Sequence, residues 1–115
     1  MTAPLWTKFF YFSASFSRGL HVYGHNYTLA VICEFTDKLD ETVLENKIQA
    51  ALIQKIHSRD LSLDVDFLKN MEITDYNLLK VFSEIISKQI HPVRLHALSL
   101  ERDSRTKLLL PATSQ

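Results

Sequence analysis

Two histidines near the N-terminus have a spacing that suits metal ligation from one face of a strand. Side chains two residues apart on a strand point to the same face, so His21, Tyr23 and His25 share a face if the strand begins that early. A catalytic zinc ion takes three protein ligands and keeps one position for water or substrate. His25 and His21 are therefore candidate metal ligands that need one further group. The alternative is that His25 donates a hydrogen bond within the sheet and His21 lies in an exposed loop.

Two further residues could act on a ligand. His57 carries the side chain whose ordinary pKa suits proton transfer near neutral pH, which makes it a candidate catalytic residue. It is equally a histidine at a helix end, favoured by the helix dipole. The carboxylate of Glu101 can accept two parallel hydrogen bonds, either from a ligand or from a neighbouring arginine such as Arg102 or Arg105.

The composition limits the classes of protein that this chain can belong to. The 115 residues are enough for one domain, residues 1–115, with a single core. Thirteen basic residues balance thirteen acidic ones, so no net charge would attract nucleic acid or a membrane surface. No apolar run approaches the ~20 residues of a membrane span, and no signal peptide is evident. We expect a cytoplasmic protein with neither nucleic-acid nor membrane partners.

The single cysteine fits the same compartment, because it excludes an internal disulfide. Cys33 lies eight residues beyond His25, or ~26 Å along an extended strand, so it cannot join a metal site there. Its apolar neighbours predict a small core residue.

Alternating apolar residues predict an N-terminal hairpin. Residues 8–16 and 25–35 read as two strands, with a break at 17–19 between them. The residues expected to share the buried face are Phe10, Phe12, Ala14 and Phe16 in the first strand, and Tyr27, Leu29, Val31 and Cys33 in the second.

A helical period follows. One helix is expected from about Asp40, and a second begins after a cap at Thr74 or Asp75 and ends before Pro92. Residues 58–72 between them have no strong period and are predicted to be irregular. The expected buried stripes are Leu44, Ile48, Ala51, Leu52 and Ile56 in the first helix, and Leu78, Leu79, Phe82, Ile85, Ile86 and Ile90 in the second.

A closing hairpin completes the predicted fold. Residues 93–100 and 107–110 read as its strands, with a turn at Asp103 and Ser104. The order β-β-α-α-β-β predicts the α+β class, with a four-stranded antiparallel sheet and two helices packed on one face. Its open edges and partly apolar outer face predict an oligomer, because uncovered edges associate.

Two short segments of the first hairpin carry a family resemblance. Phe12-Ser13-Ala14-Ser15-Phe16 and Tyr23-Gly24-His25-Asn26-Tyr27 resemble the motifs Phe-Ser-Ala-x-His and His-Gly-His-Asn-Tyr of the 6-pyruvoyl-tetrahydropterin synthase family, which includes the 6-carboxytetrahydropterin synthases. The three histidines of those motifs hold a catalytic zinc; Phe16, Tyr23 and His25 stand at their positions here. The resemblance implies a tunnelling fold in which three subunits close a barrel and two rings form a homohexamer, a dimer of trimers.

Later segments extend the resemblance over most of the chain. Residues 55–61 resemble Leu-Asp-His-Lys-x-Leu-Asp and keep its histidine as His57, with Ile56 in place of the aspartate. Residues 73–77 resemble Pro-Thr-x-Glu-Asn and keep Thr74. Glu101 stands where the family's glutamate grips the pterin ring. The resemblance implies a proton-relay role for His57, and substrate binding by Glu101 and Thr74 at the 2-aminopyrimidinone edge of a pterin or purine.

Three functions follow from these residues. The first is a synthase-like protein with a degraded zinc site, which binds a pterin- or purine-like heterocycle and does not run the zinc lyase reaction. The second is an active carbon–oxygen lyase on dihydroneopterin triphosphate with a rebuilt zinc site. The third is a non-catalytic structural oligomer. The first is favoured, because two zinc histidines, the relay aspartate and the cysteine of the family's first loop, here residues 17–22, are all replaced or missing.

Overall fold

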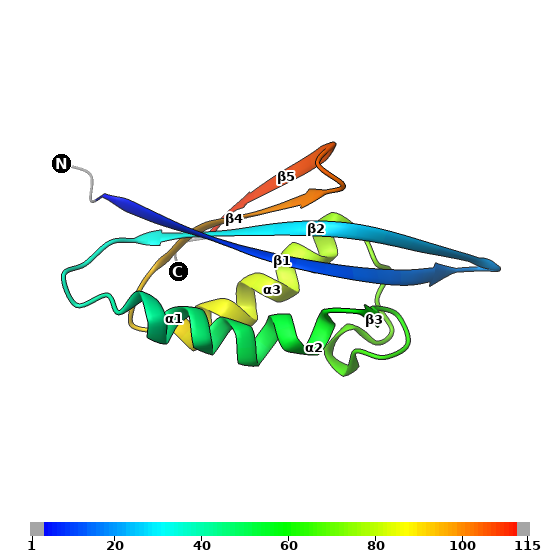
Figure 1. The fold of residues 1–115 in the computed structure, drawn as a ribbon, viewed down its shortest axis with the longest axis horizontal. Coiled ribbons are helices and arrows are strands. Elements are labelled where there is room, and N and C mark those ends of the chain that lie inside the picture. The colour runs from blue at the N-terminus through cyan, green and yellow to red at the C-terminus, as the bar shows by residue number, and fades with distance from the viewer. Residues whose placement is uncertain (1–3, 113–115) are drawn as a thin grey trace.

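The elements follow one another in the expected order, with one additional strand. The computed structural model describes residues 4–112, and its sheet has the strand order β3-β1-β2-β4-β5. The helices lie together on one side of this sheet (Figure 1). The elements are β1 (Leu5–Arg18), β2 (His21–Glu34), α1 (Glu41–Ile48), the π-helical turn η1 (Gln49–Ile53), α2 (Gln54–Ile56), β3 (Arg59–Asp60), the 3-10 turn η2 (Asp66–Leu68), α3 (Asp75–Ile90), β4 (Leu95–Arg102) and β5 (Thr106–Pro111).

The N-terminal hairpin is longer than the sequence pattern predicts. β1 and β2 pair without interruption from Leu5 opposite Glu34 to Arg18 opposite His21. The expected break at residues 17–19 is therefore wrong for Ser17 and Arg18, which continue the strand. Only two residues form the turn, and Gly19 adopts the positive φ of 63° that favours glycine. As a result the hairpin projects beyond the helices (Figure 1).

The prediction of a four-stranded antiparallel sheet is wrong by one strand. β3 pairs in parallel with the outer edge of β1, with Ala14 opposite Arg59 and Ser15 opposite Asp60. The backbone N–H of Ser58 donates to the Ser13 carbonyl at 2.6 Å, and the N–H of Leu61 donates to the Ser15 carbonyl at 2.7 Å. Two paired residues are too few to produce an alternating pattern, so this strand is formed by the open edge of β1 and leaves no signal in the sequence.

Two helical segments cover one face of the sheet, as predicted. The first is continuous through α1, η1 and α2, and the Asp40 side chain accepts from the Val43 N–H at its start, at 3.1 Å. The second is α3, where Thr74 is the cap and its hydroxyl accepts from the Asn77 N–H at 3.1 Å. Among residues 4–112, no helix is both long and apolar enough to cross a membrane.

The core forms between these helices and the inner face of the sheet. The predicted inward positions of β1 and β2 are buried, with the exception of Phe16, which is partly exposed. Cys33 is fully buried within this core, and burial raises the pKa of its thiol to about 11. The predicted helix stripes are buried too, apart from the partly exposed Ala51 and Ile85.

The opposite face of the sheet leaves large apolar side chains in solvent. Phe9 and Tyr11 on β1 are 53% and 69% exposed, and Leu109 on β5 is 54% exposed. These residues alternate with the buried ones and so point away from the helices. The expected apolar outer face is therefore present.

Candidate functional site

A cleft opens between the end of the long hairpin and the start of α3. Its volume is about 410 Å³, within the range of small-molecule sites. Four segments supply its lining: the ends of β1 and β4, the first half of β2 and the residues that enter α3. The lining residues are Phe16, Arg18, Tyr23, His25, Tyr27, Ile73, Thr74, Asp75 and Arg102.

One wall of the cleft is aromatic. Phe16 and Tyr23 lie directly opposite each other on β1 and β2, and their rings stack with centroids 5.5 Å apart and planes 27° apart. The His25 ring lies 5.8 Å from that of Phe16. Phe16, Tyr23 and His25 therefore form one cluster, and only His25 among them is a common metal ligand.

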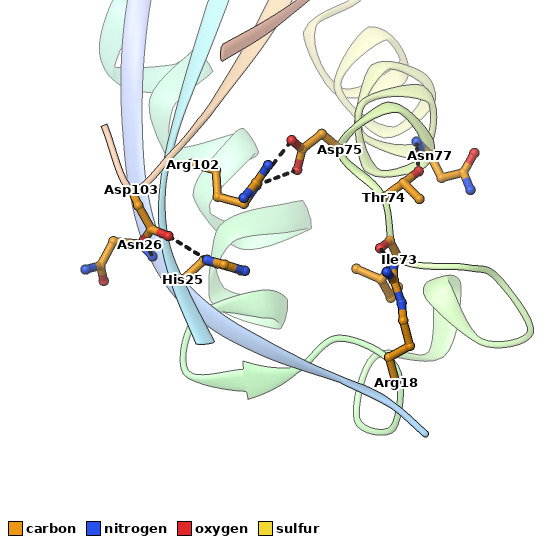
Figure 2. Close-up of polar contacts among 9 residues, drawn as sticks. All are labelled: Arg18, His25, Asn26, Ile73, Thr74, Asp75, Asn77, Arg102 and Asp103. Carbon is orange, nitrogen blue, oxygen red and sulfur yellow. Dashed lines mark hydrogen bonds and ion pairs between the residues drawn. The ribbon is translucent and has the colours of Figure 1, made fainter. Parts of the chain in front are cut away.

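The imidazole of His25 is held by Asp103, which lies in the turn after β4. His25 Nδ1 lies 2.6 Å from Asp103 Oδ2, while Asp103 Oδ1 accepts from the Asn26 N–H at 2.8 Å (Figure 2). The Asn26 N–H and the bond to His25 favour the carboxylate form, and they hold the pKa of Asp103 below its usual range. Asp103 adopts a positive φ of 54°, which aspartate tolerates better than most residues. The carboxylate fixes the orientation of the imidazole ring.

The other side of the cleft carries an ion pair. Arg102 Nε lies 3.3 Å from both carboxylate oxygens of Asp75, the first residue of α3 (Figure 2). Tyr27 lies near this pair, and burial together with the negative charge of Asp75 raises the pKa of its phenol to about 12. Thr74 also lines the cleft, but its hydroxyl is already used as the helix cap.

At the rim, Arg18 joins the hairpin to the segment before α3. Its guanidinium donates to the Ile73 carbonyl at 3.2 Å, lies 3.8 Å from a Glu72 carboxylate oxygen, and lies over the Phe16 ring at 5.6 Å. These contacts link the end of β1 to the segment that enters α3.

His57 does not line the cleft. It lies at the outer edge of β1, where its Nδ1 accepts the Ser13 N–H at 3.1 Å in the place of a strand partner. Because Nδ1 is the acceptor, the proton of the neutral ring is on Nε2. The structure gives His57 a role in attaching the segment after α2 to the sheet.

Glu101 lies on the face of the sheet that points away from the helices. It pairs with Thr28 and Lys107 in the sheet register, whereas the next residue, Arg102, pairs with Tyr27 and enters the cleft. Glu101 and Thr74 are therefore on opposite sides of the sheet within one chain, and the structure does not bring them together.

Comparison with solved structures identifies the fold. The structure of Caenorhabditis elegans 6-pyruvoyl tetrahydropterin synthase superposes with a TM-score of 0.81, over 98% of this chain and 99% of that chain, at 17% sequence identity. This chain has the 6-pyruvoyl tetrahydropterin synthase fold. The predicted resemblance is confirmed at the level of the fold, which is all that an identity this low establishes. A scan of protein-family models and a search of curated proteins gave no match.

Within this synthase fold, the donor set does not fit a zinc ion held by one chain. His21 and His25 do share a face of β2, because the strand begins at His21 as the spacing required. Their Cα atoms lie roughly 13 Å apart along the strand, and side chains stand roughly perpendicular to a strand. The two imidazoles are therefore too far apart to share one zinc ion through Zn–N bonds of about 2 Å. Across residues 4–112, no group of three or more histidine, cysteine or acidic side chains could hold a metal ion.

The sequence does not predict a functional role for Arg102, which lines the cleft, or for Asp103, which holds the cleft residue His25. The sequence predicts Arg102 only as a possible partner of Glu101, and Asp103 only as a turn residue. Their approach to Asp75 and His25 depends on the register of β4 against β2, which places Arg102 opposite Tyr27. The only signal in the sequence is the predicted turn at Asp103, and a turn alone does not identify the neighbouring strand.

Proposed function

We propose that this chain is a synthase-fold protein that binds a pterin- or purine-like heterocycle in the cleft and does not run the zinc-dependent lyase reaction. The observation that carries the proposal is the stacked pair of Phe16 and Tyr23. These rings occupy two of the three positions at which the resembled family has its zinc histidines. Phenylalanine cannot bind zinc and tyrosine is an uncommon zinc ligand, but the faces of both rings suit stacking against a planar heterocycle.

The size and lining of the cleft support such a ligand. Its volume of about 410 Å³ suits a bicyclic heterocycle. The aromatic wall is combined with a few fixed polar groups, His25 and the Arg102–Asp75 pair, which could orient the ligand. A mostly apolar site with a few oriented polar groups is typical of small-molecule binding sites.

Ligand binding by both Glu101 and Thr74 requires an assembly of several copies of the chain. Because they lie on opposite sides of the sheet in one chain, a ligand that touches both must lie between two copies. A homohexamer built as a dimer of trimers would supply such interfaces. It would also cover the outer face that exposes Phe9 and Tyr11. A cytoplasmic location is part of the same proposal and agrees with the reduced, buried Cys33.

The first test is zinc content, measured by elemental analysis on protein purified without chelators or a polyhistidine tag. We expect far less than one zinc ion per chain. About one zinc per chain would overturn the proposal and favour the lyase, with His25, His21 or a group from another copy as ligands. Conversion of dihydroneopterin triphosphate would then be assayed. His57→Ala would test in that assay whether His57 acts as a proton relay.

The second test is pterin binding, followed by the change in pterin fluorescence on titration with protein. We expect binding by the wild type and at least about tenfold weaker binding by Glu101→Gln, because a carboxylate that accepts two hydrogen bonds would be lost. Glu84→Gln, on the exposed side of α3, is the matched control. No zinc together with no binding of pterin or guanine would leave the structural oligomer as the function.

A further inference from the structure

The contact between His25 and Asp103 fixes the tautomer of the imidazole ring and leaves its other nitrogen, Nε2, without a partner in the described part of the chain. Nδ1 lies 2.6 Å from a carboxylate oxygen of Asp103, and a carboxylate can only accept, so Nδ1 carries the proton. In the neutral ring the lone pair is then on Nε2. Figure 2 shows this second nitrogen pointing away from Asp103 toward the open side of the cleft. Within residues 4–112, Nε2 makes no hydrogen bond.

Asp103 is itself held tightly, so the imidazole has little freedom to turn. Its second carboxylate oxygen accepts the Asn26 N–H at 2.8 Å, and its backbone N–H donates to the Asn26 carbonyl at 2.7 Å. These two bonds attach the turn after β4 to β2 beside His25. A ring that is oriented by a fixed carboxylate in this way keeps one tautomer and one direction.

Aromatic contacts on both sides complete the support of His25. Its ring centroid lies 5.8 Å from that of Phe16, with the planes 34° apart, and 5.9 Å from that of Tyr27, in an edge-on arrangement at 75°. Only 17% of the His25 side chain is exposed. The acceptor nitrogen therefore lies beside the aromatic cluster of the cleft, in which the ring of Tyr23 is the most exposed.

We propose that His25 Nε2 is the hydrogen-bond acceptor of this cleft for an N–H group on the edge of a planar heterocycle, and that Asp103 is the residue that positions it. The inference rests on the proposed function and gives this nitrogen a role without a metal ion. The ligand is a neutral heteroaromatic compound with a ring N–H or amino group, which donates to Nε2 while its plane stacks on the aromatic cluster.

Asp103→Asn tests the positioning with little change of shape. The asparagine Oδ1 can still accept the Asn26 N–H, and asparagine tolerates the positive φ at this position. Its amide, however, donates to His25 Nδ1 and so moves the ring proton to Nε2, which turns the acceptor into a donor. His25→Phe removes the nitrogen and keeps a flat ring. Asp66→Asn is the control, because this carboxylate is 95% exposed and is not part of the cleft lining.

Two measurements decide the inference. Imidazole 15N NMR reports the tautomer without any ligand: we expect a protonated Nδ1 in the wild type and a protonated Nε2 in Asp103→Asn. Titration with pterin, followed by its fluorescence, should give a Kd at least about tenfold weaker in Asp103→Asn and in His25→Phe, and unchanged in Asp66→Asn.

The results separate this inference from the proposed function. Pterin binding by the wild type that is unchanged in Asp103→Asn and His25→Phe would overturn the role of His25 and leave the proposed function standing. A wild-type ring protonated on Nε2 would overturn the inference at once. No pterin binding by the wild type would overturn both.

Discussion

Phe16 and Tyr23 face each other across the β1–β2 pair, and their rings stack 5.5 Å apart at two of the positions where the resembled family has zinc histidines. His25 lies next to them on the same face. Under the proposed function, this is the strand geometry of a three-histidine zinc site in which two of the ligands are replaced. Restoring the two imidazoles should be enough to recreate a metal site.

The first prediction is that Phe16→His combined with Tyr23→His binds about one zinc ion per chain, because three imidazoles would then converge from adjacent strands. Elemental analysis after dialysis against zinc, and thermal unfolding with and without zinc, measure the effect. Zinc should raise the unfolding temperature, since it binds only the folded chain. Phe9→His combined with Leu109→His is the matched control, because both residues are exposed on the opposite face of the sheet and β2 and β4 lie between their strands. A folded double variant with no more zinc than this control would contradict the prediction.

Much of the fold is predictable from the sequence, because burial imposes a period on it. The inner faces of the first hairpin, both helices and the Thr74 cap follow from local patterns that the structure repeats. β3 and the length of the hairpin do not, since they depend on the open edge of β1 and on pairing between strands. Register is a long-range property that a local pattern does not contain.

The cleft is only partly predictable for the same reason. His25 and Thr74 lie in it as candidate site residues, whereas Asp103 reaches His25 through the pairing of β4 with β2. Glu101 is at the expected strand end, but the two-residue alternation of β4 directs it to the outer face. A family motif gives the position of a residue along the chain, whereas the register and alternation of the strands determine the face of the sheet to which its side chain points.

The second prediction concerns His57, whose Nδ1 accepts the Ser13 N–H at the edge of β1. His57→Ala leaves this N–H without its partner and should lower the free energy of unfolding by about 1 kcal/mol, measured by urea denaturation. His96→Ala, an exposed histidine on β4, is the control and should change stability by less than about 0.5 kcal/mol. Equal unfolding midpoints for wild type and His57→Ala would show that the contact does not stabilise the fold.

The third prediction concerns the cap of α3. Thr74→Ala removes the hydroxyl that accepts the Asn77 N–H and should cost about 1 kcal/mol of unfolding free energy. Thr74→Ser keeps the hydroxyl and should retain most of the stability. If both variants lose stability equally, the methyl group of Thr74, and not its cap bond, is the stabilising part.

The fourth prediction is a loss of stability at alkaline pH caused by Tyr27. Burial and the nearby charge of Asp75 raise the pKa of this phenol to about 12, against about 10 in the unfolded chain. Because the folded pKa is the higher one, the stabilisation is fully present below pH ~10 and is lost as the pH rises through ~12. Between about pH 9 and 11 the unfolding free energy of the wild type should fall by about 1 kcal/mol more than that of Tyr27→Phe. Tyrosinate absorbance gives an independent check, since the ionisation of Tyr27 should appear as a late step with a pKa of about 12 that vanishes in Tyr27→Phe. The absence of this late step in the folded wild type would mean that water reaches Tyr27 freely, and that the cleft around Tyr27 is more open than its burial indicates.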